Sequence, residues 1–270
     1  MKNYILSVLL FIISGAAQIS DSVATEQIGP NSEKEIEKLR KELAHSANNP
    51  DNIAAEYRLA TLIRHRIDPK THQYIVTDET RQIYEGIVKK YNHMDYYSAD
   101  LPNHPRSEQI IVPECAVTAG FYQKEQEKAR QYYLKALECL NQTYLRRKKD
   151  WQTAPAPKKL PEDSPFGGPR EMAKWESRMS MWQKKKQDAE QGDVLHEIEL
   201  GIIKRAVKSY LLSYLSEYSD KNHPSLNQDK VRKATMKIMK DFPDTPISDC
   251  ASEYSDIIVN VLGKVRLVTK

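Results

Sequence analysis

The stretch from Ser107 to Tyr144 places the strongest constraint on the fold of this chain. Its residues form two apolar, helix-favouring runs joined by a polar turn near Gln123–Glu127. In the second run, Ala129, Tyr133 and Ala136 recur at intervals of 4 and 3 residues, which places them on one face of a helix. Small side chains on that face allow close helix approach, and the aromatic ring fills the remaining gap. The stretch therefore predicts an antiparallel helical hairpin.

The composition extends this prediction to the whole chain. Only 9 of the 270 residues are Gly, and residues that favour helices, such as Lys, Glu, Ala, Leu and Gln, dominate. Alternating β-branched runs are nearly absent, so we predict an all-α protein of one large or two modest domains. The net charge of +4 is small for this length. Dedicated nucleic-acid binders concentrate basic charge on one face, so no nucleic-acid partner is expected.

The first 17 residues have the order of a secretory signal peptide. A positive start at Lys2 precedes an apolar run from Tyr4 to Ile13 and then small residues, which predicts cleavage after Ala16 or Ala17. The apolar run is about half the ~20 residues that a spanning helix needs. The first cysteine is Cys115, so the cysteine of a lipoprotein is missing. We expect an exported protein, periplasmic or extracellular and not a lipoprotein, with no transmembrane segment in the mature chain.

Apolar periodicity and breaker residues divide the mature chain into further segments. Residues 18–32 are polar and read as a flexible leader, 33–145 as helical hairpins, 146–170 as a basic, proline-rich connector, and 171–270 as a helical part that completes the array. The helices outside the central hairpin are expected at 33–46, 52–66, 77–91, 171–191, 194–218, 226–241 and 247–267. The segment 194–218 has the widest apolar arc and is expected to be the most buried helix.

A spacing of 4, 3 and 5 residues recurs in three of these helices. It is shared by Thr80, Tyr84, Ile87 and Asn92, by Ala129, Tyr133, Ala136 and Asn141, and by Val231, Thr235, Ile238 and Pro243. This resembles the second helix of the tetratricopeptide repeat, with a small residue, an aromatic, a small residue and a helix-ending residue. The resemblance implies helical hairpins stacked as a right-handed array, with a long Pro/Lys-rich insertion, whose concave face binds peptides or other proteins.

The chain departs from the repeat pattern at several places. Leu59 and Thr80 are farther apart than in a regular repeat, which indicates an insertion. Pro113 stands where the central repeat has an aromatic residue, and Gly120 where it has a tyrosine. The region 144–218 does not follow the register. An irregular helical bundle is therefore the alternative architecture.

Motifs for catalysis and metal binding are missing from the sequence. None of the seven histidines has a second histidine at i+4, and no nucleophile elbow, phosphate loop or dinucleotide fingerprint occurs. His93, Asp95, Asp100 and His104 share one loop, but such loops are commonly just solvated. We therefore expect no enzyme, no metal and no cofactor. The odd number of cysteines, three, leaves at least one thiol free or paired between chains. A disulfide between Cys115 and Cys139 is one alternative that the sequence allows.

Residues 146–191 have an unusual composition. They hold all three tryptophans and twelve basic residues against seven acidic ones. Tryptophan with nearby cations is typical of interaction surfaces. The alternative is that Trp175 and Trp182 dock their helix onto 194–218. The residues proposed for an interaction surface are Trp151, Trp175, Trp182, Lys184, Lys185 and Lys186, together with Tyr84 and Tyr133 from the repeat-like helices.

Three hypotheses of function follow from the sequence. The first is an exported helical-repeat scaffold that binds another protein or peptide without a cofactor. The second is a protein that binds an anionic envelope polymer or lipid surface through residues 146–191. The third is a helical enzyme of a class that the sequence does not reveal. Binding that depends on charge weakens as salt rises, and this separates the first two.

Overall fold

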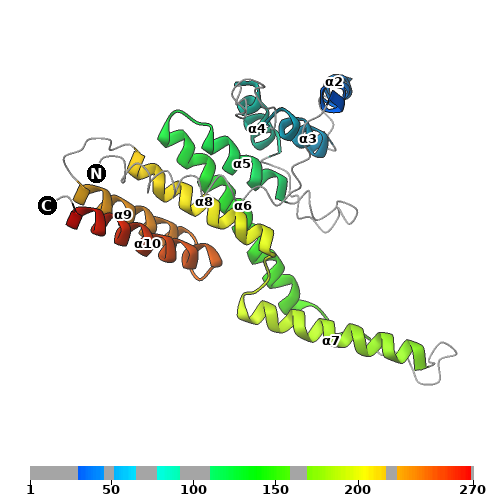
Figure 1. The fold of residues 1–270 in the computed structure, drawn as a ribbon. Helices are drawn as coiled ribbons and strands as arrows, with labels where there is room; N and C mark the ends of the chain where they lie inside the picture. Colours follow the sequence, from blue (N-terminus) through cyan, green and yellow to red (C-terminus); the bar gives the residue numbers. More distant parts are fainter. Residues whose placement is uncertain are drawn as a thin grey trace.

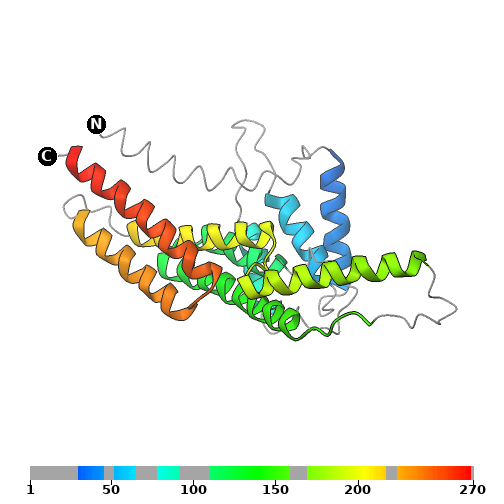
Figure 2. The ribbon, with the colours of Figure 1, turned by 90° about the horizontal axis from the view of Figure 1, so that it is seen from below.

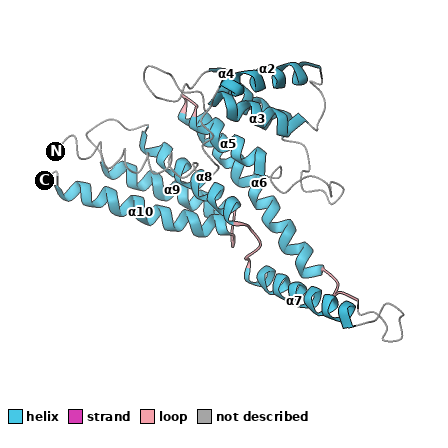
Figure 3. Ribbon diagram, turned by 45° about the vertical axis from the view of Figure 1, so that its right-hand side comes forward, coloured by secondary structure: helices cyan, strands magenta, loops and turns pink. Residues whose placement is uncertain are grey.

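The computed structural model describes residues 30–45, 52–64, 78–91, 110–158, 169–216 and 224–268. The predicted signal peptide, the loop with His93 and His104, and the tip of the proline-rich segment lie outside these residues. Throughout the described part the regular elements are helices, which confirms the all-α fold class (Figure 3). They are α2 (Pro30–His45), α3 (Ile53–Arg64), α4 (Asp78–Tyr91), α5 (Ile111–Phe121), α6 (Gln126–Thr153), α7 (Pro169–Gln191), α8 (Glu197–Ser216), α9 (Pro224–Asp241) and α10 (Pro246–Val268).

The helices pack in a series in which most elements contact their neighbours along the chain. Each of α2 to α6 packs against the next helix, and α3 also touches α5. Helix α8 then packs on α5 and α6, and the α9–α10 hairpin packs on α8. As a result, α2 and the α9–α10 hairpin lie at opposite ends of the packed body (Figure 1). The right-handed tetratricopeptide-like superhelix stays a prediction.

The central hairpin is confirmed with its turn at the predicted place. α5 ends at Phe121 and α6 begins at Gln126. Ala129, Tyr133 and Ala136 are all buried on one face of α6. Their burial against α5 shows that the 4 and 3 spacing marks the packed face of the helix.

Gly120 gives a physical reason for the missing tyrosine of the repeat pattern. A Cβ atom at Gly120 would lie 2.6 Å from the Cε1 atom of Tyr133. The ring of Tyr133 therefore lies directly against the backbone of α5, in the space that any side chain at Gly120 would need. Tyr133 is thus the aromatic residue of the second helix, and it fills the space that a tyrosine at position 120 of the first helix would need.

The boundary predicted at residue 146 is wrong. α6 continues through the basic run to Thr153, because Lys and Arg favour helix and the first proline after the start of α6 is Pro155. α7 is also not part of the packed array. It contacts α6 and, in Figure 1, extends beyond the packed body; Figure 2 shows the same helix from below. We call residues 146–158 together with α7 the arm.

Burial is deepest in the central hairpin. A large core unites α3 to α6 with α8 to α10, and a smaller core joins α2 and α3 around Ile36, Leu59 and Ile63. In α5, nine of the eleven residues are buried, so α5 and not the 194–218 segment is the most buried of the described helices. The expectation for 194–218 is wrong because α8 leaves Ile198 and Lys204 exposed, whereas Phe121 is the one exposed residue of α5.

Burial of tyrosine hydroxyls predicts a loss of stability at high pH. Burial raises the pKa of Tyr84, and it raises that of Tyr133 to about 12. Below about pH 10 the hydroxyls are protonated in both folded and unfolded chains; above it the unfolded chain loses its protons first, so stability falls. The free energy of unfolding should therefore fall between pH 9 and 11, and Tyr84→Phe should reduce that fall by about 1.4 kcal/mol over the whole interval. A free energy of unfolding that is the same at both pH values would contradict this burial.

Candidate functional site

Aromatic and charged side chains from four packed helices converge on one side of the body. We call this group the tyrosine–arginine cluster. The helices α3, α5 and α8 meet there although they are far apart in the sequence, because α5 packs on both of the others. The members are Tyr57 and Arg64 on α3, Tyr84 on α4, Glu114 on α5, Tyr122 after α5, and Arg205 on α8.

The ion pair between Glu114 and Arg205 joins α5 to α8. Both guanidinium nitrogens of Arg205 donate to the two carboxylate oxygens of Glu114, with Nη1 to Oε1 at 2.9 Å. The side chain of Glu114 is only 13% exposed and that of Arg205 only 21%. A two-point contact of this kind fixes the orientation of the guanidinium plane as well as its position. The pair therefore holds one edge of the cluster rigid.

Arg64 is the second cation of the cluster. Burial on its own would lower the pKa of its guanidinium, but Tyr122, Tyr84 and Glu114 raise it, and a hydrogen bond joins Arg64 to the Tyr84 hydroxyl. Among the described residues no carboxylate forms an ion pair with Arg64. Glu114 acts on it through space while forming its ion pair with Arg205. Two guanidiniums thus share one carboxylate, which leaves a net positive charge in a partly desolvated place.

Tyrosine rings surround these charges. Tyr57 and Tyr122 are half-buried, while Tyr84 lies beneath them in the core. Burial, followed by the field of Glu114, raises the pKa of Tyr57, so its hydroxyl stays protonated at neutral pH. One helical turn after Arg205 lies Lys208, and partial burial lowers the pKa of its amine. Such a surface offers hydrogen-bond donors and cations to an anionic or acceptor-rich ligand.

The sequence reasoning singled out only Tyr84 of this cluster. One usable signal was Glu114, which is the only charged residue in the apolar run from Ile111 to Phe121. A carboxylate in such a helix needs a cationic partner from another element. The identity of that partner, Arg205, could not be read from the sequence because 91 residues separate the two.

The structure corrects the prediction for Tyr84 and Tyr133. Their side chains are 1% and 5% exposed, so both are core residues and not part of an accessible surface. Tyr133 packs against Gly120, and its hydroxyl has a hydrogen bond with Ser209. The helical spacing that drew attention to them reports packing between helices.

The two tryptophans of α7 dock, but onto a different partner from the one expected. The indole nitrogen of Trp175 donates to the carbonyl of Pro157, and that of Trp182 to the carbonyl of Ala154, each at 3.1 Å. The segment that follows α6 therefore lies along α7. Helix 194–218 is not their docking surface, and Trp151 lies half-buried near the end of α6.

The spacing of these two hydrogen bonds explains the fit. Trp175 and Trp182 are seven residues apart, which is about 10.5 Å along a helix. Their acceptors are three residues apart in an extended, proline-containing segment, about 9.3 Å if the segment has polyproline II geometry. The φ and ψ of Ala154, −58° and 125°, fit that geometry. The indoles thus clamp one turn of an extended chain.

The lysines next to Trp182 are not equivalent. Lys184 is exposed. Lys185 lies 3.8 Å from Asp188, and the amine of Lys186 lies 5.0 Å from the centre of the Trp182 ring. Of the predicted cationic surface, Lys184 is the member that projects into solvent, while Lys186 helps to cover the docked indole.

The docking of the tryptophans can be measured by the exchange of their indole N–H protons. We expect the Trp175 and Trp182 signals to exchange slowly with solvent and the Trp151 signal to exchange faster, since its indole has no hydrogen bond to a described residue. Replacing one such bond changes stability by about 1 kcal/mol. Trp182→Phe should therefore weaken the attachment of the segment at Ala154 to α7 without unfolding the other helices. Equal exchange of all three indoles would contradict the docked arm.

The base of the arm is fixed by a buried carboxylate. Glu199 accepts a hydrogen bond from the backbone N–H of His196 at 2.8 Å, which caps the start of α8, and another from Arg147 of α6 at 2.7 Å. Gly192, with φ of +81°, ends α7 where the Tyr144 hydroxyl comes close. These contacts join α6, α7 and α8 at the base of the arm.

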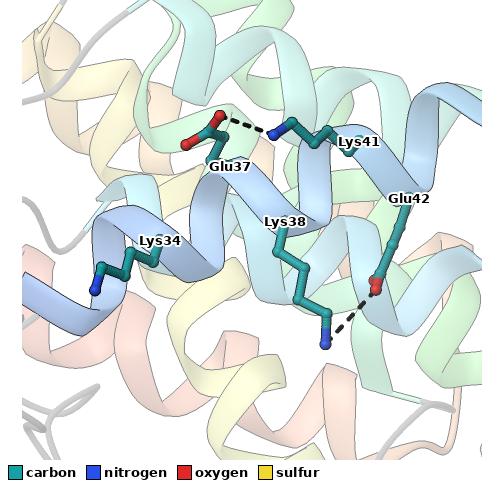
Figure 4. A pocket seen from close by; sticks show the side chains of 5 residues that line it. All are labelled: Lys34, Glu37, Lys38, Lys41 and Glu42. Carbon is teal, nitrogen blue, oxygen red and sulfur yellow. Dashed lines mark ion pairs between the residues drawn. The ribbon is translucent and has the colours of Figure 1, made fainter.

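Other candidate sites lack the required geometry. In the part of the chain that the structure describes, no three His, Cys, Asp or Glu side chains are placed to hold a metal ion. The three cysteines are free thiols, and burial raises the pKa of the fully buried Cys115 well above its usual value. No described helix has the length and apolar character needed to cross a membrane. A shallow hollow on α2 is lined only by charged side chains of that one helix (Figure 4).

Comparisons with protein-family models, with curated proteins and with solved structures found no match for this chain, so its resemblance to the tetratricopeptide repeat stays a prediction.

Proposed function

We propose that this chain is an exported helical-repeat protein that binds another protein, and that its binding site is the tyrosine–arginine cluster. The observation that carries the proposal is the charge balance of the cluster. Arg64 and Arg205 share the single carboxylate of Glu114 in a half-buried, tyrosine-lined place where α3, α5 and α8 meet. Tyrosine and arginine are the residue types that dominate the energetics of protein interfaces.

The same features indicate the kind of ligand. A net positive charge in partly desolvated surroundings favours an acidic side chain, and the tyrosine hydroxyls add hydrogen-bond partners for a peptide backbone. The Arg205–Glu114 pair keeps its own geometry, so Arg64 is the cation available to a carboxylate of the ligand. The expected ligand is therefore a peptide segment of a partner protein with at least one acidic residue.

A selection from a random peptide library on the immobilised chain tests this function. We expect enrichment of acidic sequences, and Arg64→Gln should weaken their binding at least about tenfold, the usual size of a lost charged hydrogen bond. Arg58→Gln is the matched control, because Arg58 lies on the same helix but pairs with Glu35 of α2. Equal loss in both variants, or peptides without acidic residues, would count against the cluster.

A second candidate function rests on the arm. Its described residues carry eleven basic side chains against five acidic ones, so the arm alone is more positive than the whole chain. This favours an anionic polymer or lipid surface. Cosedimentation with anionic vesicles tests it: binding should fall with salt and with Lys184→Gln, whereas Arg64→Gln should leave it unchanged.

A further inference from the structure

The two ends of the packed body carry different surfaces. At the α2 end, charges of both signs alternate on the outer face and pair within the helix. Lys38 lies 3.7 Å from Glu42, and Lys41 lies 3.0 Å from Glu37 (Figure 4). Such a mixed, self-paired face is what the end of a helical array needs in water. α2 therefore forms a polar cap.

The α9–α10 hairpin at the other end separates its charges between two helices. On α9, Lys233, Met236 and Lys240 follow one another at 3 and 4 residues and form an exposed stripe. Met236 lies at the centre of this stripe and is 68% exposed. Arg232 and Lys237 flank it on the same exposed side. The outer face of α9 is thus mainly basic with an apolar centre, and Asp229 at its beginning lies 3.6 Å from Arg232.

The outer face of α10 has the opposite charge. Asp249, Glu253 and Asp256 follow one another at 4 and 3 residues and are all exposed. Ile257 lies beside them and is 47% exposed. Three of the seven exposed large apolar side chains among the described residues, Met236, Met239 and Ile257, belong to this one hairpin. The concentration of apolar side chains indicates a surface that a partner covers.

The two stripes lie at the same level of the hairpin but do not neutralise one another. The side-chain amide of Gln228 lies 3.4 Å from the carbonyl of Val259, which sets the register of the antiparallel pair. By this register, Lys240 is level with the first turn of α10, and Lys233 is level with Glu253. No ion pair joins the basic stripe to the acidic stripe among the described residues.

We propose that a second copy of this chain covers this hairpin and forms a twofold dimer. A twofold axis along the hairpin places each α9 over the partner's α10 at the same level. Lys240 then faces the partner's Asp249, Lys233 faces the partner's Glu253, and Met236 lies between these two contacts. The basic stripe of each α9 then meets the acidic stripe of the partner's α10, which is the self-complementarity that a twofold interface requires.

The charge pattern favours a second copy over other occupants. An anionic membrane or polymer would attract the α9 stripe, but the acidic stripe of α10 would repel it. A purely acidic or purely basic protein meets the same conflict. A surface that carries both stripes side by side in matching register is complementary to itself. The inference is independent of the peptide-binding function assigned to the tyrosine–arginine cluster.

Charge reversal with complementation tests the dimer. The purified full chain is measured by sedimentation equilibrium at concentrations up to about 100 µM, which detects micromolar association. Two variants are prepared, Lys233→Glu with Lys240→Glu, and Asp249→Lys with Glu253→Lys. All four positions are exposed, so circular dichroism should show that both variants keep their helical content.

We expect the parent chain to dimerise and each variant to dimerise at least about tenfold more weakly, because like charges then face each other. An equimolar mixture of the two variants should associate again, since the reversed stripes match. A parent chain that is monomeric throughout overturns the proposal. Dimers that are unaffected by both reversals, or a mixture that does not recover, overturn it as well, because the interface then lies elsewhere.

Discussion

Replacing Glu114 by alanine will lower the free energy of unfolding by about 3 kcal/mol. The change removes the carboxylate that both guanidinium nitrogens of Arg205 contact. Arg205 then keeps its charge in a place where it is only 21% exposed, with Arg64 nearby. The size of the effect comes from this uncompensated charge more than from the lost contact. Urea unfolding at pH 7 measures it.

Two control variants separate this cause from ordinary surface effects. Glu35→Ala removes a carboxylate that also bridges two helices, by 3.1 Å to Arg58, but these side chains are 41% and 48% exposed and remain in contact with water. Its effect should stay below about 1 kcal/mol. Glu114→Leu combined with Arg205→Met should recover most of the stability, because no buried charge is left without a partner. Equal losses for Glu35→Ala and Glu114→Ala would contradict this account.

Gly120→Ala should be the second most destabilising of the proposed changes, at about 2 kcal/mol. The new methyl group would lie 2.6 Å from the ring of Tyr133. That ring cannot turn away freely, since it is buried and its hydroxyl is bonded to Ser209. The clash outweighs the gain in helix propensity that alanine brings over glycine, about 1 kcal/mol.

Gly86→Ala and Gly201→Ala are the matched controls. Both glycines lie within helices, α4 and α8, and a Cβ atom at either position meets nothing within 4 Å. These changes should therefore raise stability by about 0.5–1 kcal/mol, through helix propensity alone. Thermal or urea unfolding of the three variants gives the comparison. A Gly120→Ala variant that is as stable as the Gly86→Ala variant would show that Tyr133 does not pack as described.

The helices could be predicted from the sequence because their apolar residues recur with the helical period. The segment expected at 77–91 is α4 at Asp78–Tyr91, and the one expected at 247–267 is α10 at Pro246–Val268. The error at 146–153 has a different origin. The basic charge of those residues suggests a connector, whereas a Lys/Arg run without proline continues a helix.

The candidate site was harder to predict than the helices. Arg64, Glu114 and Arg205 meet only because α3, α5 and α8 pack side by side, and periodicity within one helix holds no information on that contact. Tyr84 and Tyr133 show the reverse case. Their spacing places them on one helical face, but the same pattern is found in buried helix contacts and in exposed binding surfaces.

The tryptophans of α7 could be recognised as a stripe but not matched to their partner. An indole N–H needs an acceptor when it is covered, and helix 194–218 was the most apolar neighbour in the sequence. The actual acceptors are the carbonyls of Ala154 and Pro157. A backbone carbonyl next to a proline leaves no mark in an apolar periodicity, so this docking required the structure.

Hydrogen–deuterium exchange of the full chain, with and without a selected acidic peptide, tests the central claim most directly. Binding at the tyrosine–arginine cluster predicts slower exchange at the C-terminal end of α3, in α5 and around Arg205 of α8, with α7 and α9 unchanged. Protection confined to α7 would contradict the claim and assign binding to the arm. Protection confined to α9 and α10 would contradict it too, because the peptide would then occupy the terminal hairpin.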